Sequence, residues 1–356
     1  MILRPGNFRT VFTTRSPHFM ARTNSTPKRP SGTAHADHPG THGTKRMTGG
    51  ATRAAKSKPT SKGEKGAKPA RGKHVEKDRR AVLAAATGES ADRMEVEYSQ
   101  GQVVLSFAVG ERPVFAGAWE AELQMADGSA IPAKGAWESV CWHSDSDGDY
   151  LELQLQPAEG LRIDRMLFVS RDGEFALLAD AVISESGAPA VVNYTTTIPL
   201  AAQLTADIST ETRERVLKAK GMSARLFPLG LGSDPADGSG GSLEIHGDTL
   251  KLEQSIVGGN VWVPLLIDWN SSRAKKPAVW RRLTVSESRV VIGPHQASAA
   301  RWQCGGEHLL CYRALTTPEL ARAVLGLHTW YETVVARIPK PGTYTSLVQI
   351  EQAAGE

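Results

Sequence analysis

Cysteines and long apolar runs are scarce in this sequence of 356 residues. The three cysteines, Cys141, Cys304 and Cys311, are odd in number and widely spaced, so they cannot form a disulfide framework. We expect reduced thiols in strands, which favours a cytoplasmic protein. No stretch approaches the ~18 consecutive apolar residues of a membrane-spanning helix, and a transmembrane segment is therefore not predicted.

Several common catalytic and targeting motifs are also missing. There is no Gly-x-Ser-x-Gly nucleophile elbow, and the glycine-rich stretches near residues 230 and 240 match neither a P-loop nor a dinucleotide fingerprint. The first residues lack the apolar core and cleavage site of a secretory signal. Their arginines, with no acid before Asp37, also fit a mitochondrial transit peptide, although Pro5 and Pro17 would interrupt its helix.

Charge is distributed unevenly along the chain. Residues 1–80 contain 19 Lys/Arg and four Asp/Glu, whereas the remaining residues contain 23 and 34. Residues 23–80 have almost no large apolar side chain, so we predict a disordered basic tail over residues 1–91, with a short helix over 76–86. Lys/Arg without aromatics over residues 22–80 would bind nucleic acid through its phosphates only. A solubilising extension is the alternative.

From residue 92 the hydrophobic period changes to two, which predicts one all-β domain over 92–356. Residues 149–156 (DYLELQLQ) alternate strictly, as in a half-buried antiparallel strand. Arg-Asp-Gly at 171–173 predicts a hairpin between two strand-like runs. Only residues 317–323 look helical within the domain. Many short strands with regular turns favour a large two-sheet antiparallel β-sandwich.

One acidic cluster suggests a cation site. Asp145, Asp147 and Asp149 occupy alternate positions in HSDSDGDY, and carboxylate oxygens are the ligands that calcium prefers. The glycine position and the missing acid at position 12 exclude an EF-hand loop. A polar turn before the strand at 149–156 explains the same residues. Calcium is thus the one cofactor that the sequence suggests, and the polar turn is the simpler alternative.

Several segments taken together resemble a known family. They are residues 137–155, 162–183, 198–200, 211–214, 226–231, 263–269, 280–287 and 309–338. In this order they resemble a bacterial protein family with members labelled heparinase II/III-like. The likeness to heparinase itself rests on the hairpin that contains Arg165, Arg171, Asp172, Phe175 and Asp180. The resemblance covers roughly residues 94–351 and implies the C-terminal β-sandwich of those lyases, without the helical toroid that supplies most of their catalytic groups.

The resemblance raises the question of lyase chemistry. Such chemistry needs a group that neutralises a uronate carboxylate and a Tyr or His that removes the α-proton. His143, Tyr150, Arg165 and Tyr194 are of the right types, but no spacing places any two of them together. Shared fold does not transfer activity. We therefore expect a non-catalytic β-sandwich that binds or organises a partner such as a carbohydrate. A polysaccharide lyase or hydrolase and a nucleic-acid-associated protein are the alternatives.

Overall fold

The strands of this structure form a third layer in addition to the two packed sheets that the sequence predicts. The computed structural model describes residues 72–85, 92–185, 190–209, 211–238, 240–340 and 342–351. The tail predicted to be disordered lies, up to residue 71, outside the described residues. The described chain is almost entirely antiparallel β-structure, which confirms the all-β fold class. None of its helical turns has the length or apolar character of a membrane span.

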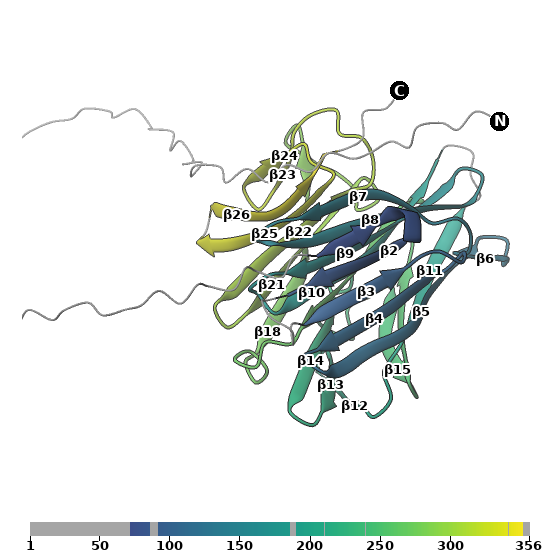
Figure 1. Ribbon diagram of the computed structural model, residues 1–356. Coiled ribbons are helices and arrows are strands. Elements are labelled where there is room, and N and C mark those ends of the chain that lie inside the picture. Colours follow the sequence, from purple (N-terminus) through teal and green to yellow (C-terminus); the bar gives the residue numbers. More distant parts are fainter. Residues whose placement is uncertain are drawn as a thin grey trace, which may run out of the picture. The chain divides into compact units, whose positions relative to one another are not determined.

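The first sheet has nine strands, in the order β1-β2-β3-β4-β5-β11-β16-β15, with β6 paired to β5 (Figure 1). Their bounds are β1 Lys73–Val75, β2 Arg80–Ala84, β3 Arg93–Glu97, β4 Val103–Val109, β5 Arg112–Met125, β6 Ala130–Pro132, β11 Val191–Pro199, β15 Gly241–His246 and β16 Thr249–Ser255.

The second sheet has eight strands, in the order β12-β13-β14-β17-β10-β9-β8-β7. Their bounds are β7 Glu138–Ser144, β8 Gly148–Ala158, β9 Leu161–Ser170, β10 Phe175–Ser184, β12 Thr205–Ile208, β13 Arg215–Ala219, β14 Met222–Pro228 and β17 Val261–Asp268. The expected hairpin at 171–173 is confirmed, because it joins β9 to β10.

The third sheet has five strands, in the order β18-β21-β22-β25-β26, and a fourth, small sheet has the order β20-β19-β23-β24. Those of the third sheet are β18 Ala278–Leu283, β21 Ala297–Cys304, β22 Glu307–Ala314, β25 Thr333–Lys340 and β26 Thr343–Ile350. Those of the fourth are β19 Ser286–Glu287, β20 Val290–Val291, β23 Arg322–Val324 and β24 Leu327–Thr329.

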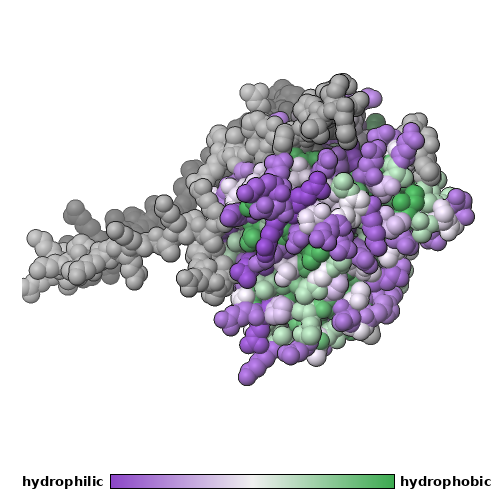
Figure 2. All heavy atoms as spheres, turned by 45° about the vertical axis from the view of Figure 1, so that its right-hand side comes forward, coloured by the Kyte–Doolittle hydropathy of each residue, from purple (hydrophilic) through white to green (hydrophobic). Residues whose placement is uncertain are grey.

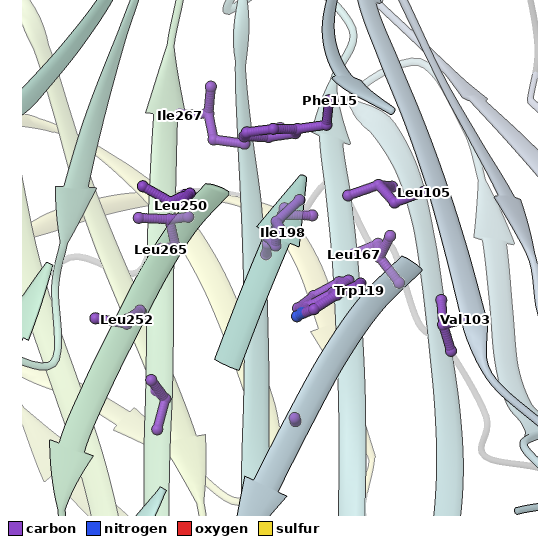
Figure 3. Close-up of a cluster of buried hydrophobic side chains, with 14 of the residues drawn as sticks. Val103, Leu105, Phe115, Trp119, Leu167, Ile198, Leu250, Leu252, Leu265 and Ile267 are labelled. Carbon is purple, nitrogen blue, oxygen red and sulfur yellow. The ribbon is translucent and has the colours of Figure 1, made fainter. Parts of the chain in front are cut away.

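Three hydrophobic cores separate these layers. The first lies between the first and second sheets, where Trp119 and Ile198 pack near Leu167 and Leu265 (Figure 3). The second joins the opposite face of the second sheet to the third. The third core lies between the third and fourth sheets. Because both faces of the second sheet are covered, β10 and β17 are buried along almost their whole length.

The start of the domain and two predicted helices need correction. The first sheet begins at Lys73 and not near residue 92, since β1 and β2 pair in series with β3. Among the described residues 76–85, only Glu76–Asp78 form a 3₁₀ turn, and β2 follows because Ala81 and Leu83 enter the first core, which overrides local helix propensity. Residues 317–323 form no helix, because 317–321 are irregular and β23 begins at Arg322; the Glu287 carboxylate accepts the amides of Glu319 and Leu320.

The three cysteines form no disulfide and are buried in strands, as expected. Cys141, Cys304 and Cys311 all belong to the second core. Burial raises the pKa of the Cys311 thiol to about 12, so this thiol stays protonated at neutral pH. These residues pack as small apolar side chains.

Candidate functional site

The acidic sequence HSDSDGDY forms the turn of the β7–β8 hairpin. Asp145 Oδ1 accepts the backbone amides of Asp147 at 2.8 Å and Gly148 at 3.1 Å. The Nε2 atom of His143 lies 3.1 Å from Asp145 Oδ2. Partial burial would raise the pKa of Asp145, but the hydrogen bonds with His143 and the two amides outweigh it and lower this pKa to about 2. The carboxylate is therefore ionised and has the geometry of an Asx turn.

Asp149 joins the first two sheets. Its Oδ1 lies 2.5 Å from Arg171 Nη2 and accepts the Ser144 hydroxyl, while Oδ2 accepts the backbone amide of Ala84 at 2.8 Å. Arg171 in turn donates to the carbonyl oxygen of Ala84. Both charged side chains are buried, so this ion pair connects the end of β2 to the β7–β8 and β9–β10 turns.

Asp145, Asp147 and Asp149 share a hairpin, but they do not converge. Within the part of the chain that the structure describes, no three His, Cys, Asp or Glu side chains gather in a metal-holding cluster.

The calcium hypothesis stays a prediction: calcium would raise the melting temperature of the protein, and Asp147→Ala would remove the rise. A differential scanning fluorimetry titration measures it. An unchanged melting temperature in millimolar calcium contradicts the hypothesis.

Arg165, Asp180 and Tyr194 meet between the first and second sheets. Arg165 Nε and Nη2 donate to the two carboxylate oxygens of Asp180 at 2.9 and 2.8 Å, and Nη1 donates to the carbonyl oxygen of Trp119. The Tyr194 hydroxyl donates to Asp180. The guanidinium carbon lies 3.9 Å from the ring centroid of Trp119 and 4.7 Å from that of Trp137. Every polar end of this trio therefore has a partner inside the protein.

Electrostatics fix the charge state of this trio. Burial alone would lower the pKa of Arg165, but the charge and hydrogen bonds of Asp180 outweigh burial and raise it. Burial and the negative charge of Asp180 raise the pKa of Tyr194 well above its usual value. Tyr194 is accordingly a neutral donor, and a base that removes a substrate proton would have to be ionised.

Tyr150 belongs to a second buried network, between the second and third sheets. Its hydroxyl donates to Glu152 Oε2 at 2.8 Å. Arg313 Nη2 of β22 lies 3.0 Å from Glu152, 2.6 Å from Asp164 and 3.0 Å from Glu332. Burial, followed by the negative charge of Glu152, raises the pKa of Tyr150 well above its usual value. One guanidinium thus holds three carboxylates from two layers.

The second sheet separates the four candidate catalytic residues into two pairs. His143 and Tyr150 are cross-strand neighbours on the face toward the third sheet. Arg165 and Tyr194 lie on the opposite face, in the first core. Tyr150, Arg165 and Tyr194 are at most 1% exposed. A cavity beside Asp180 measures about 10 Å³, which holds about one water molecule and no sugar ring.

The most consequential charged residue was not among the sequence candidates. Arg313 and its carboxylates Glu152, Asp164 and Glu332 come from strands or loops far apart in the sequence. Arg313 stands in the apolar run of β22, and only this position offered a signal. Asp180 and Arg171 belong to the hairpin that carried the heparinase resemblance, and both are in buried ion pairs.

Comparison with known proteins relates the fold to heparinases. No protein-family description matches the chain, and no curated protein matches it. The heparan sulfate lyase HepC from Pedobacter heparinus is similar in structure, with a TM-score of 0.51 and 10% identity, over 69% of this chain and 42% of that one. A heparinase III structure gives a TM-score of 0.49 and 11% identity over 68% and 42%. The chain thus has a heparinase-like fold and spans less than half of those proteins.

Proposed function

We propose that the described domain is a non-catalytic β-sandwich module that binds or organises carbohydrate. The observation that supports this most is the fold similarity to the heparan sulfate lyase, which covers 69% of this chain but 42% of the enzyme. A shared fold does not transfer activity, so this likeness supports a carbohydrate-related module, and cleavage is tested separately below.

The buried ion pairs support the same proposal. Lyase chemistry needs an ionisable Tyr or His and a cationic group that both touch substrate. Here Arg165 is bound to Asp180, and Tyr150 to Glu152, inside closed cores. Freeing Arg165 for a substrate would leave the Asp180 carboxylate buried without its counter-charge, which costs about 3–5 kcal/mol. These residue types are therefore assigned to stabilising the layers.

A screen of the full chain against polysaccharides tests the proposal. We expect retention of one or more polysaccharides on a glycan array, with no unsaturated uronate product by ultraviolet absorbance. The surface is accessible to a polysaccharide, which would permit binding, whereas the Tyr150 and Arg165 side chains are inaccessible to it and so cannot take part in cleavage. Release of unsaturated product would overturn the non-catalytic assignment and favour the lyase alternative, and the absence of any glycan binding would overturn the proposal as a whole.

A separate assay with duplex DNA tests whether the basic tail contacts nucleic acid. The excess of Lys/Arg over residues 1–80 supports electrostatic contact with phosphates, which would weaken steeply as salt rises. A matched chain without residues 22–71 keeps every described strand. If this chain binds duplex DNA as well as the full chain does, the tail has no such role.

A further inference from the structure

The outer face of the third sheet is only partly covered. Side chains alternate along its strands, so that Trp280 and Trp302 point into the second core. The side chains at the alternate positions of these strands point outward. At one end of this outward face Ala299, Leu310 and Tyr312 pack in the third core, against the fourth sheet.

The uncovered end carries five outward side chains, which we call the arginine face. They are Val279 and Arg281 of β18, Arg301 and Gln303 of β21, and His308 of β22. Arg281 is cross-strand from Arg301, and Val279 is cross-strand from Gln303, which is cross-strand from His308. Arg281 is exposed, and Arg301, Gln303 and His308 are half-buried. The five side chains therefore form one contiguous patch.

Two like charges stand opposite each other on this patch. Directly opposed like charges destabilise an antiparallel strand pair. Arg301 donates to Gln303 Oε1 at 2.9 Å, and neither Arg281 nor Arg301 forms an ion pair within the described residues. The buried arginines differ from them in having carboxylate partners, as in Arg165–Asp180, Arg225–Glu214 and Arg273–Asp268.

The surrounding sheet adds to the positive charge. Its five strands contain six Lys or Arg and one acid, Glu307. Arg313 and Arg337 are paired with carboxylates, so the remaining positive charge belongs to Arg281, Arg282, Arg301 and Lys340, which form no ion pair within the described residues. Glu307 pairs with Arg337 at 2.9 Å and so does not neutralise the patch. Residues 271–306 contain seven Lys or Arg and one acid, Glu287, which pairs with Arg322. This positive region lies in a domain with more acids than bases.

We propose that the arginine face binds the anionic groups of an acidic polysaccharide, a proposal that rests on the function proposed above. Guanidinium groups bind sulfate and carboxylate oxygens through paired N–H donors, and an anion between Arg281 and Arg301 removes their repulsion. Gln303 and His308 supply polar groups for neighbouring hydroxyls. Trp280 and Trp302 point inward, so these two rings cannot stack on a ligand and recognition rests on the charged and polar groups. The fold similarity to the heparan sulfate lyase favours a polysaccharide over nucleic acid.

The test measures the binding of three full-length chains, the parent and two double variants. The ligands are a labelled heparan sulfate oligosaccharide, a neutral oligosaccharide and duplex DNA. Arg281→Gln/Arg301→Gln is expected to lower the affinity for the sulfated oligosaccharide at least tenfold, as measured by fluorescence anisotropy. Arg93→Gln/Arg112→Gln removes the same charge from the first sheet, and its affinity is expected to stay within twofold of the parent. The thermal midpoint of Arg281→Gln/Arg301→Gln is expected to stay equal or rise, because repulsion is relieved.

A second measurement separates the arginine face from the basic tail. Hydrogen–deuterium exchange with the sulfated oligosaccharide should show protection in 278–283 and 297–304 of the parent and none there in Arg281→Gln/Arg301→Gln. Sulfated oligosaccharide that binds both double variants equally, without this protection, overturns the site but leaves carbohydrate binding standing. Binding of the neutral oligosaccharide alone has the same meaning. If neither oligosaccharide binds, the proposed function fails, and loss of DNA binding alone in the Arg281/Arg301 variant assigns the face to nucleic acid.

Discussion

Asp180→Ala is expected to lower the free energy of unfolding by about 3–5 kcal/mol. The substitution removes both oxygens that Arg165 binds and leaves a guanidinium at 0% exposure without its counter-charge. It also removes the acceptor of the Tyr194 hydroxyl. Domains are stable by about 5–15 kcal/mol, so a loss of this size is a large part of the total. Urea denaturation followed by tryptophan fluorescence measures it.

Two companion variants show whether the unpaired charge is the cause. Tyr194→Phe removes one hydrogen bond to a charged group and should cost about 1.5–3 kcal/mol. Arg165→Met/Asp180→Leu/Tyr194→Phe removes both charges and the buried hydroxyl that would lose its acceptor. Buried pairs replaced by apolar residues often keep their stability, so this variant should recover most of the loss. If Asp180→Ala unfolds within 1 kcal/mol of the parent, roughly the scale of an exposed pair, the buried ion pair does not stabilise the sandwich.

The strand β8 shows what alternation predicts and what it leaves out. The sequence 149–156 predicted a strand with Leu151 and Leu153 on one face, and both are in the first core. It also predicted a solvent face with Tyr150 and Glu152, yet both are buried. The reason is the third sheet, which covers that face and supplies Arg313. Alternation records the polarity of a face, and a polar face can be buried when distant residues provide its partners.

The candidate site was predictable to a similar extent. The sequence identified the residue types at 143, 150, 165 and 194 but not their partners. Arg165 pairs with Asp180 of the neighbouring strand, and the Tyr194 hydroxyl reaches Asp180 from the facing sheet, a contact that sequence spacing does not reveal. The start of the domain was missed for a related reason. Residues 76–86 have the local composition of a helix, and strand pairing with β3 outweighs that preference.

Arginine has two opposite arrangements in this fold. Arg165 and Arg313 are buried, and each is surrounded by carboxylates and oxygen acceptors. Arg281 and Arg301 are accessible and face each other. A buried guanidinium must be paired to avoid a large desolvation cost, whereas an accessible pair is hydrated and can take an external anion. The first arrangement holds layers together, and the second supports recognition.

Arg313→Met is expected to destabilise the protein by about 3–5 kcal/mol or more, the cost typical of a broken buried pair. Three carboxylates, those of Glu152, Asp164 and Glu332, would lose their shared guanidinium between two layers. The loss should appear first as separation of the third sheet, because Arg313 belongs to β22 and two of the carboxylates belong to β8 and β9. Hydrogen exchange at β21 and β22 would detect it.

A series of charge-neutral variants distinguishes lost charge from lost packing. Without Arg313 the carboxylates of Glu152, Asp164 and Glu332 repel one another inside the protein, so adding Glu152→Gln and Glu332→Gln to Arg313→Met should recover part of the lost stability. Arg112→Met, at an exposed position of β5, removes the same charge and should unfold within about 0.5 kcal/mol of the parent. If the two Gln substitutions restore no stability to Arg313→Met, Arg313 acts through packing, and the carboxylate cluster does not hold the third sheet to the second.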